Sequence, residues 1–270
     1  MPVTLLGIPA VILYLAVGWL FAQRLFQRDD PAFLGKQGIL ILGLLAALLH
    51  AWVLSQQVLT SAGLDLRFFH AISLVGWMVA ALFMVAALNW PLENLGVIIS
   101  PLAGLGLGLD LSFQGHQVLV ERHSLGLDLH IAFSILAYSL LSIAAVQAVL
   151  LAVQEKHLRD RRPGGFIRAL PPLETMESLL FQIIGLGFTL LTLALIKGFI
   201  FLDNIFAQHL VHKTVLSLVA WGVFAILLWG RWRFGWRGRI AIRWTLAGFA
   251  ILALGYFGSK LVLELILGRV

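Results

Sequence analysis

The side chains best able to do chemistry in this sequence are its eight histidines, and there is no cysteine. The absence of cysteine excludes disulfides, a thiolate metal site and covalent attachment of a c-type haem to this chain. Metal or haem chemistry would therefore have to come from imidazole ligands. We find no catalytic triad, phosphate-binding loop or catalytic pair of carboxylates, so we do not expect an enzyme.

His130 is the first candidate ligand, because it lies in an otherwise apolar segment with Ser134 and Tyr138 at successive spacings of four. This spacing puts the three polar side chains on one face of a helix. His50 also lies in an apolar segment, and an ionisable group inside a membrane helix is by default a candidate for a functional site. For both histidines the alternative is a structural hydrogen bond to a neighbouring helix.

His212 begins another apolar segment and is followed within five residues by a lysine, a threonine and a serine. Two histidines from two helices at one membrane depth can be the two axial ligands of haem. We therefore predict His130 and His212 as ligands of a non-covalently held b-type haem, with Tyr138 in the binding site and His50 as a further candidate. The remaining histidines are most simply interpreted as loop or interface residues: His70, His116, His123, His157 and His209.

Two lysines and two tryptophans inside apolar segments allow two interpretations each. Lys197 and Lys260 can extend to the membrane interface or pair with an anionic group such as a haem propionate, and Asp203 is a candidate partner for one of them. Trp77 and Trp221 lie deep in their segments, where core packing is a simpler role than contact with a cofactor.

Long apolar segments must position these residues. The 270-residue chain is 60% hydrophobic and 12% charged, with a mean hydropathy of +0.97, whereas soluble domains are about 25% charged. We expect an all-α, polytopic transmembrane helix bundle of about eight spans, forming a single integral membrane domain over residues 1–270. Since a span needs about 20 apolar residues, we place helices at roughly 3–23, 37–56, 69–90, 95–111, 126–154, 177–202, 210–230 and 242–266.

The loops that follow the first, fifth and seventh predicted helices hold most of the lysines and arginines. Such loops are retained in the cytoplasm, so we expect both termini on the outer side, and an uncleaved first helix. His50, His130 and His212 then lie toward the outer face. Loop charge also explains the net charge of +6, which does not indicate nucleic acid binding.

Five motifs in the C-terminal half carry a resemblance to a known family. They are Leu129–Ile131 with Ala137–Tyr138, Pro171–Glu174, Lys213–Trp221, Gly235–Arg239 and Tyr256–Lys260. In these the chain resembles the CcsA/HemX-like cytochrome c assembly proteins, and most closely the YpjD-type branch of the bacterial inner membrane. The resemblance implies a bundle of the eight-helix type, haem handling in cytochrome c maturation, a periplasmic outer face, and haem and membrane or cytochrome assembly proteins as partners.

Characterised members of that family present haem between two histidines that flank a tryptophan-rich WWD motif, and His130 matches the first of these histidines. In place of the motif this chain has Phe206–His212, and no histidine follows the segment 242–266. We therefore keep as an alternative a membrane accessory or transport-linked protein that shares the fold without haem. A small secondary transporter is a further alternative, to which only the glycine-rich stretch 103–108 points.

Overall fold

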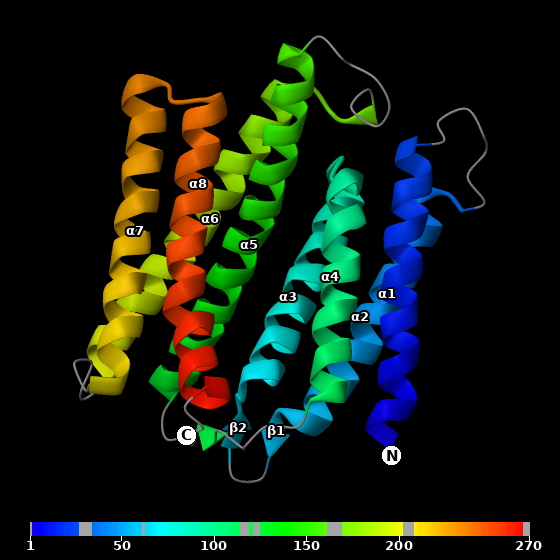
Figure 1. The fold of residues 1–270 in the computed structure, drawn as a ribbon, viewed down its shortest axis with the longest axis vertical. Helices are drawn as coiled ribbons and strands as arrows, with labels where there is room; N and C mark the ends of the chain where they lie inside the picture. Colours follow the sequence, from blue (N-terminus) through cyan, green and yellow to red (C-terminus); the bar gives the residue numbers. More distant parts are fainter. Residues whose placement is uncertain are drawn as a thin grey trace. The chain divides into compact units, whose positions relative to one another are not determined.

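The computed structural model describes residues 2–26, 34–60, 63–113, 119–120, 125–160, 169–201 and 208–266. In these ranges eight helices are long and apolar enough to cross a membrane, which confirms the all-α prediction of eight spans. The helices are α1 (Pro2–Phe26), α2 (Lys36–Gln57), α3 (Phe68–Asn89), α4 (Glu93–Ser112), α5 (Leu125–Arg159), α6 (Leu173–Phe201), α7 (Gln208–Phe234) and α8 (Gly238–Ala253) (Figure 1).

Helix ends differ from the predicted ones mainly where polar residues continue a helix beyond its apolar part. α5 ends at Arg159, five residues past the predicted end, and α6 begins at Leu173, four residues before the predicted start. A hydropathy count stops at the first charged residues, whereas a helix keeps its own backbone hydrogen bonds through the membrane interface.

The last predicted helix is regular only in its first part. After α8 the chain forms two π-helical turns, η2 (Leu254–Gly258) and η3 (Leu261–Ile266). Such turns are rare, and they occur frequently at functional sites.

The chain divides into two compact units. Unit 1 comprises Met1–Val120 and Lys156–Pro172, and unit 2 comprises Glu121–Glu155 and Leu173–Val270. The single integral membrane domain over residues 1–270 stays a prediction, and the units are described separately.

In unit 1, α1 and α3 both pack against α2 and α4. Glycines allow close approach: a Cβ atom built on Gly18 of α1 would lie 2.6 Å from Cγ of Pro101 on α4. The glycine-rich α4 also approaches α1 closely, because a Cβ atom on its Gly104 would lie 3.1 Å from Cβ of Tyr14. Gly96 and Gly104 of α4 are therefore packing residues, whereas Gly108 has open space around its Cβ position.

A small antiparallel sheet lies at one end of unit 1, in the order β1 (Leu59–Thr60), β2 (Gly63–Asp65), β3 (Leu119–Val120). β2 pairs with β1 through Leu64 and Leu59, and with β3 through Leu64 and Val120. The sheet was not predicted, because strands of two or three residues are too short to show a hydrophobic alternation.

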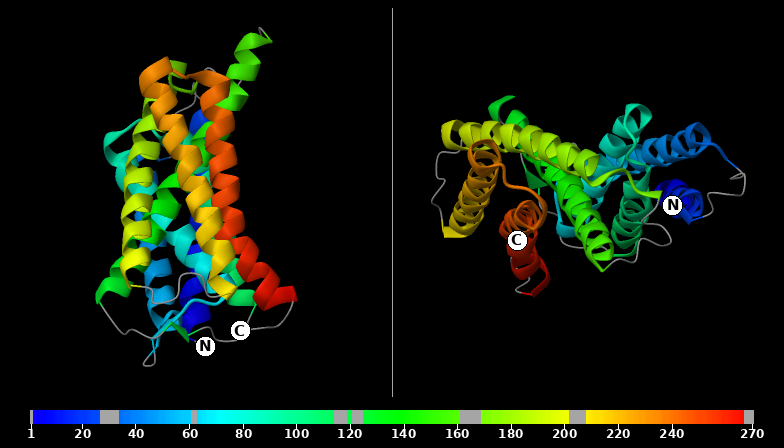
Figure 2. Two further views of the ribbon diagram at one scale, coloured as in Figure 1. Left: turned by 90° about the vertical axis from the view of Figure 1, so that its left-hand side faces the viewer. Right: turned by 90° about the horizontal axis from the view of Figure 1, so that it is seen from above.

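In unit 2, α7 packs against α6 and α8, and Figure 2 shows α7 and α8 side by side. The α7–α8 contact is close at Gly248, where an added Cβ atom would lie 2.9 Å from Cζ of Phe224. α5 joins α6 through the Gln147 side chain, whose Nε2 donates to the backbone oxygen of Met176 at 3.1 Å.

Candidate functional site

His130 lies in the second turn of α5 and is half-buried. Its Nδ1 lies 2.8 Å from the backbone oxygen of Ala194 on α6. A carbonyl oxygen only accepts, so Nδ1 carries the proton, and in the neutral ring Nε2 presents a free lone pair. Nε2 has no hydrogen-bond partner within the part of the chain that the structure describes. Histidines that bind metals are commonly held in this way, by a backbone carbonyl on the other ring nitrogen.

The polar stripe that begins with His130 is bonded within unit 2. Because α5 is helical throughout, Ser134 and Tyr138 share the face of His130, as the spacing predicts. The hydroxyl of Ser134 donates to the backbone oxygen of His130 at 2.7 Å. The buried ring of Tyr138 packs edge-on against Phe249 and Phe257, with centroids 5.7 and 5.3 Å away. The stripe therefore connects α5 with α6 and with α8.

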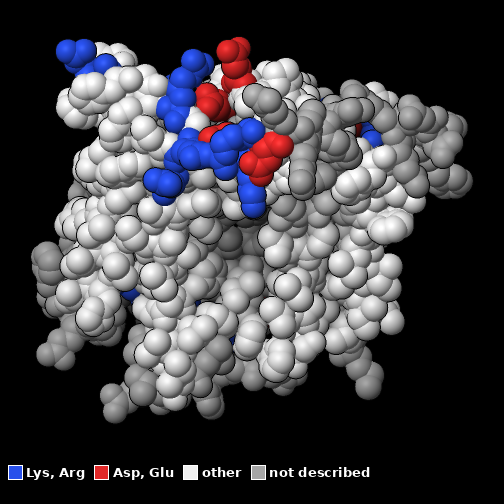
Figure 3. All heavy atoms as spheres, turned by 45° about the horizontal axis from the view of Figure 1, so that its top comes forward, with Lys and Arg blue, Asp and Glu red and all other residues white. Residues whose placement is uncertain are grey.

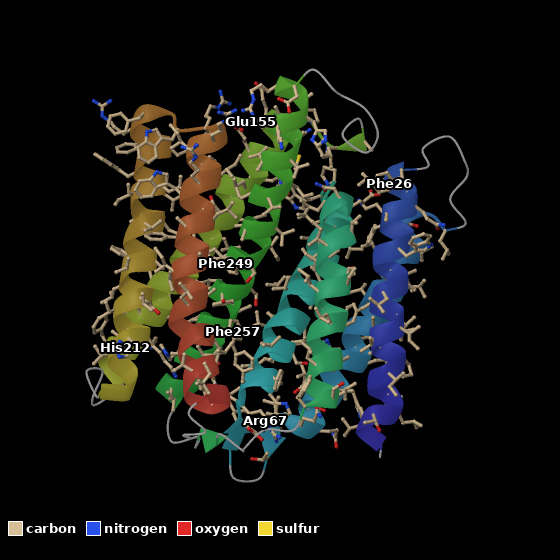
Figure 4. The ribbon with its side chains drawn as sticks, viewed as in Figure 1. Phe26, Arg67, Glu155, His212, Phe249 and Phe257 are labelled. Carbon is tan, nitrogen blue, oxygen red and sulfur yellow. The ribbon has the colours of Figure 1, made fainter. Side chains whose placement is uncertain are left out.

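The turn η2 links this stripe to the first turns of α7. Tyr256 also lies beside Tyr138, with ring centroids 6.3 Å apart, while a Cβ atom on Gly255 would lie 3.0 Å from Cβ of Leu216 on α7. His212 is exposed one turn before Leu216 (Figure 4). The structure thus connects the surroundings of Tyr138 and His212 through η2, and the pairing of His130 with His212 on one ligand stays a prediction.

A charged cluster lies beside η2. Lys260 is buried, and its Nζ lies 2.5 Å from Oε1 of Glu264. Lys213 of α7 interacts electrostatically with both. Two basic side chains and one acidic side chain therefore lie near one another beside η2.

Glu264 was missed in the sequence, where Lys260 was considered only with the membrane interface, a haem propionate or Asp203. The i, i+4 spacing of Lys260 and Glu264 was the available signal. Asp203 lies outside the described residues, and Lys197 is half-buried on α6.

His50 belongs to unit 1, whereas the other three predicted site residues belong to unit 2. It is fully buried, and its Nε2 shares a hydrogen bond of 2.9 Å with Oγ of Ser73 on α3. The ring of Tyr14 contacts it edge-on. His50 and His130 therefore each make a hydrogen bond to a neighbouring helix. This is the structural role that the sequence analysis kept as the alternative to ligand binding.

His70 differs from its interpretation as an interface residue. It is buried on α3, and its Nδ1 pairs with Oδ1 of Asp110 on α4. The missed signal was Asp110 itself, a carboxylate within an apolar helix. The side chains of the other histidines interpreted as loop residues, His116, His123 and His209, lie outside the described part.

Trp77 and Trp221 both pack against neighbouring helices, in agreement with the core-packing role that was the simpler interpretation of the sequence. Trp77 donates from Nε1 to the backbone oxygen of Ala47 at 2.8 Å. Trp221 donates to Oγ1 of Thr192 at 2.9 Å and stacks on Phe188.

The segment Gly235–Arg239 comprises the turn between α7 and α8 and the first two residues of α8. Gly235 and Gly238 have φ angles of +66° and +53°, a left-handed conformation that glycine adopts without strain. The backbone N–H of Gly238 donates to Oε1 of Glu177 on α6 at 2.7 Å, and Arg239 pairs with Glu155 of α5 at 2.9 Å. Figure 3 shows acidic and basic side chains gathered together at this end. Besides its predicted role as a topology signal, the segment holds the end of unit 2 together.

No group of three or more histidine, cysteine or acidic side chains among the described residues is arranged to hold a metal ion. Unit 2 brings together an imidazole with a defined hydrogen bond, an aromatic cluster around Tyr138, and the basic side chains of Lys213 and Lys260. The eight long apolar helices define a polytopic membrane protein, in which Nδ1 of His130 is held by a backbone oxygen of a neighbouring helix.

The chain belongs to the cytochrome C assembly protein family, whose model matches residues 39–267. It is 33% identical over 247 residues to the inner membrane protein YpjD of Escherichia coli, a match that covers 87% of this chain and 92% of that protein. It is 25% identical to the cytochrome c biogenesis protein CcsA of Chlamydomonas reinhardtii over 73% of this chain and 58% of that protein. Protein HemX of Brevibacillus brevis is 23% identical over 48% of each chain. No solved structure matches this chain.

Proposed function

We propose that this protein handles haem for cytochrome c maturation in a bacterial inner membrane and performs no bond-making chemistry of its own. Family membership supports the maturation role, since matched relatives are named as cytochrome c biogenesis proteins. The observation that carries the haem proposal is the hydrogen bond from Nδ1 of His130 to Ala194. It fixes the tautomer in which Nε2 can bind iron.

The residues of unit 2 fit a non-covalently held b-type haem. Such a haem supplies an iron with axial positions, a flat apolar ring and two carboxylates. His130 would hold the iron through Nε2, and the exposed His212 would be the second ligand. Tyr138 and Phe257 provide aromatic surface next to the His130 stripe. The basic side chains of Lys213 and Lys260 would attract the carboxylates.

The proposed site faces the outer, periplasmic side. Arg231, Arg237 and Arg239 lie at the other end of α7 from His212, and basic ends are retained in the cytoplasm. With eight spans, both termini then lie outside. This orientation places haem where other membrane or cytochrome assembly proteins, the proposed partners, can receive it.

The test is a visible absorption spectrum with a pyridine haemochrome assay on protein purified in detergent from haem-replete cells. Wild type should show a Soret band that is lost or shifted in His130→Ala and in His212→Ala. His157→Ala is the matched control, because His157 lies at the far end of α5 from His130, and its spectrum should equal that of wild type. A colourless wild type that stays colourless after haem is added would refute the haem proposal.

A membrane accessory protein without haem is the second candidate function. The inter-helix hydrogen bonds of His50 and His130 favour it, since each gives its histidine a structural role. On that view all variants remain colourless, and His130→Ala lowers stability because it removes the bond between α5 and α6.

A further inference from the structure

Arg243 is a charged side chain inside a helix that is apolar enough to cross a membrane. The candidate span begins at Gly238, and Arg243 is the sixth residue of α8. With a rise of about 1.5 Å per residue, its Cα atom lies about 8 Å along the helix axis from that of Gly238. The side chain is exposed. An exposed charge at this depth is costly unless it reaches a polar partner near the membrane surface.

The two arginines that precede Arg243 on and before α8 are engaged by carboxylates of the protein. Arg237 lies 3.4 Å from Glu177, and Arg239 lies 2.9 Å from Glu155. Arg243 forms no ion pair or hydrogen bond with any residue in the part of the chain that the structure describes. Its guanidinium group is therefore available to a partner from outside the chain.

The exposed face of α8 continues from Arg243 as an apolar stripe. Ala247, Ala250 and Leu254 follow it at spacings of four, three and four residues, and all three are exposed. These spacings place the four side chains on one face of a helix. This face therefore presents a cation near the start of the helix and apolar side chains beyond it. A phospholipid has the same order of groups, a phosphate followed by an acyl chain.

Aromatic rings next to Arg243 indicate the level of the membrane surface. The ring centroid of Trp244 lies 5.6 Å from that of Trp236, which in turn stacks on Phe234 at 6.4 Å. Tryptophan is enriched at the level of the lipid headgroups. The long side chain of Arg243 can extend toward that level from its position within the span.

The charge at this end of unit 2 favours an anionic headgroup. Arginines outnumber glutamates around the turn between α7 and α8, and Figure 3 shows these charged side chains gathered together. They are Arg231, Arg233, Arg237, Arg239 and Arg243, with Glu155, Glu174 and Glu177. An excess of basic side chains next to a membrane helix attracts anionic lipids. A zwitterionic headgroup also carries an ammonium group, which the same excess repels.

We propose that the exposed face of α8 is a binding site for one anionic phospholipid. The lipid phosphate accepts two hydrogen bonds from the planar guanidinium group of Arg243, a geometry that lysine cannot reproduce. One acyl chain lies along Ala247, Ala250 and Leu254. The site does not depend on haem binding elsewhere in unit 2.

Native mass spectrometry of the whole protein, released from detergent with added lipid, tests this proposal. Wild type should bind one phosphatidylglycerol about fivefold more tightly than one phosphatidylcholine with the same acyl chains. Arg243→Gln should abolish this preference, and Arg243→Lys, which keeps the charge, should retain part of it. Arg159→Gln is the matched control, because it removes an exposed arginine at the same end of the protein and should keep the wild-type preference.

The wild-type comparison decides the proposal without any variant, and helical circular dichroism checks that each variant is folded. Equal binding of the two lipids by wild type overturns the proposal. So does a folded Arg243→Gln that keeps the preference, or an equal loss in Arg159→Gln, which would show a general effect of charge. Displacement of phosphatidylglycerol by excess inorganic phosphate would identify a site for free anions and would also overturn the lipid site.

Discussion

The carboxylate of Glu177 should stabilise unit 2 by capping α8 from a neighbouring helix. Gly238 is the first residue of α8, and its N–H is one of the groups that no intrahelical carbonyl can satisfy. Glu177 accepts that N–H at 2.7 Å and also lies 3.4 Å from Arg237. Arg237 is 57% exposed, so the ion pair is screened and adds little. Loss of the charged cap in Glu177→Ala should cost about 1–2 kcal/mol.

Unfolding by SDS in mixed micelles, followed by helical circular dichroism, measures this loss. Glu177→Gln keeps an oxygen acceptor but loses the charge, so its cost should be about half that of Glu177→Ala. Glu174→Ala is the control, because Glu174 is an exposed acidic residue in the first turn of the same helix. Equal losses of stability for Glu174→Ala and Glu177→Ala would refute the capping argument. The loss would then come from removing any negative charge at the start of α6, and not from the hydrogen bond to Gly238.

Three further predictions concern the packing of the helices, and the same unfolding measurement tests them. Gly18→Leu should cost about 1–3 kcal/mol by overpacking α1 against α4, while Gly35→Ala, with open space around its Cβ position, should cost under about 0.5 kcal/mol; equal costs would contradict the close contact. Trp221→Phe should lose about 0.6 kcal/mol, the average for a hydrogen bond between membrane helices, and Thr192→Val should then add nothing to it. His50→Leu leaves the buried hydroxyl of Ser73 without its partner on α2 and should cost about 1–3 kcal/mol of stability. A variant as stable as wild type would show that the His50–Ser73 hydrogen bond does not stabilise unit 1.

The helices could be predicted from the sequence because each depends on a local property. A run of about 20 apolar residues has to be a helix in a bilayer, whatever its neighbours are. The packing of unit 1 was less accessible, because the glycine-rich stretch 103–108 of α4 was interpreted only as a feature that points to a transporter. Gly104 shows the reason. It is in close contact with Tyr14 of another helix, and a local sequence pattern does not predict which residue a glycine will contact across a helix interface.

The candidate site was only partly predictable for a related physical reason. Periodicity placed His130, Ser134 and Tyr138 on one face, and this follows from helix geometry alone. The partner of His130 is a backbone oxygen of Ala194, 64 residues away, and an alanine carries no chemical signal in the sequence. The pairing of His70 with Asp110 crosses 40 residues and was missed because His70 was interpreted as an interface residue and Asp110 was not considered.

The two inter-helix histidines differ in which ring nitrogen is engaged, and this difference separates their expected roles. His130 donates from Nδ1, so its remaining nitrogen is Nε2, at the far end of the ring from the backbone, on a half-buried side chain. His50 uses Nε2, so its remaining nitrogen is Nδ1, close to its own backbone, on a side chain with no exposed surface. A large planar ligand can approach Nε2 of a half-buried ring far more easily than Nδ1 of a fully buried one. We therefore expect haem to be lost from His130→Ala and retained by His50→Gln, and the reverse result would place the ligand in unit 1.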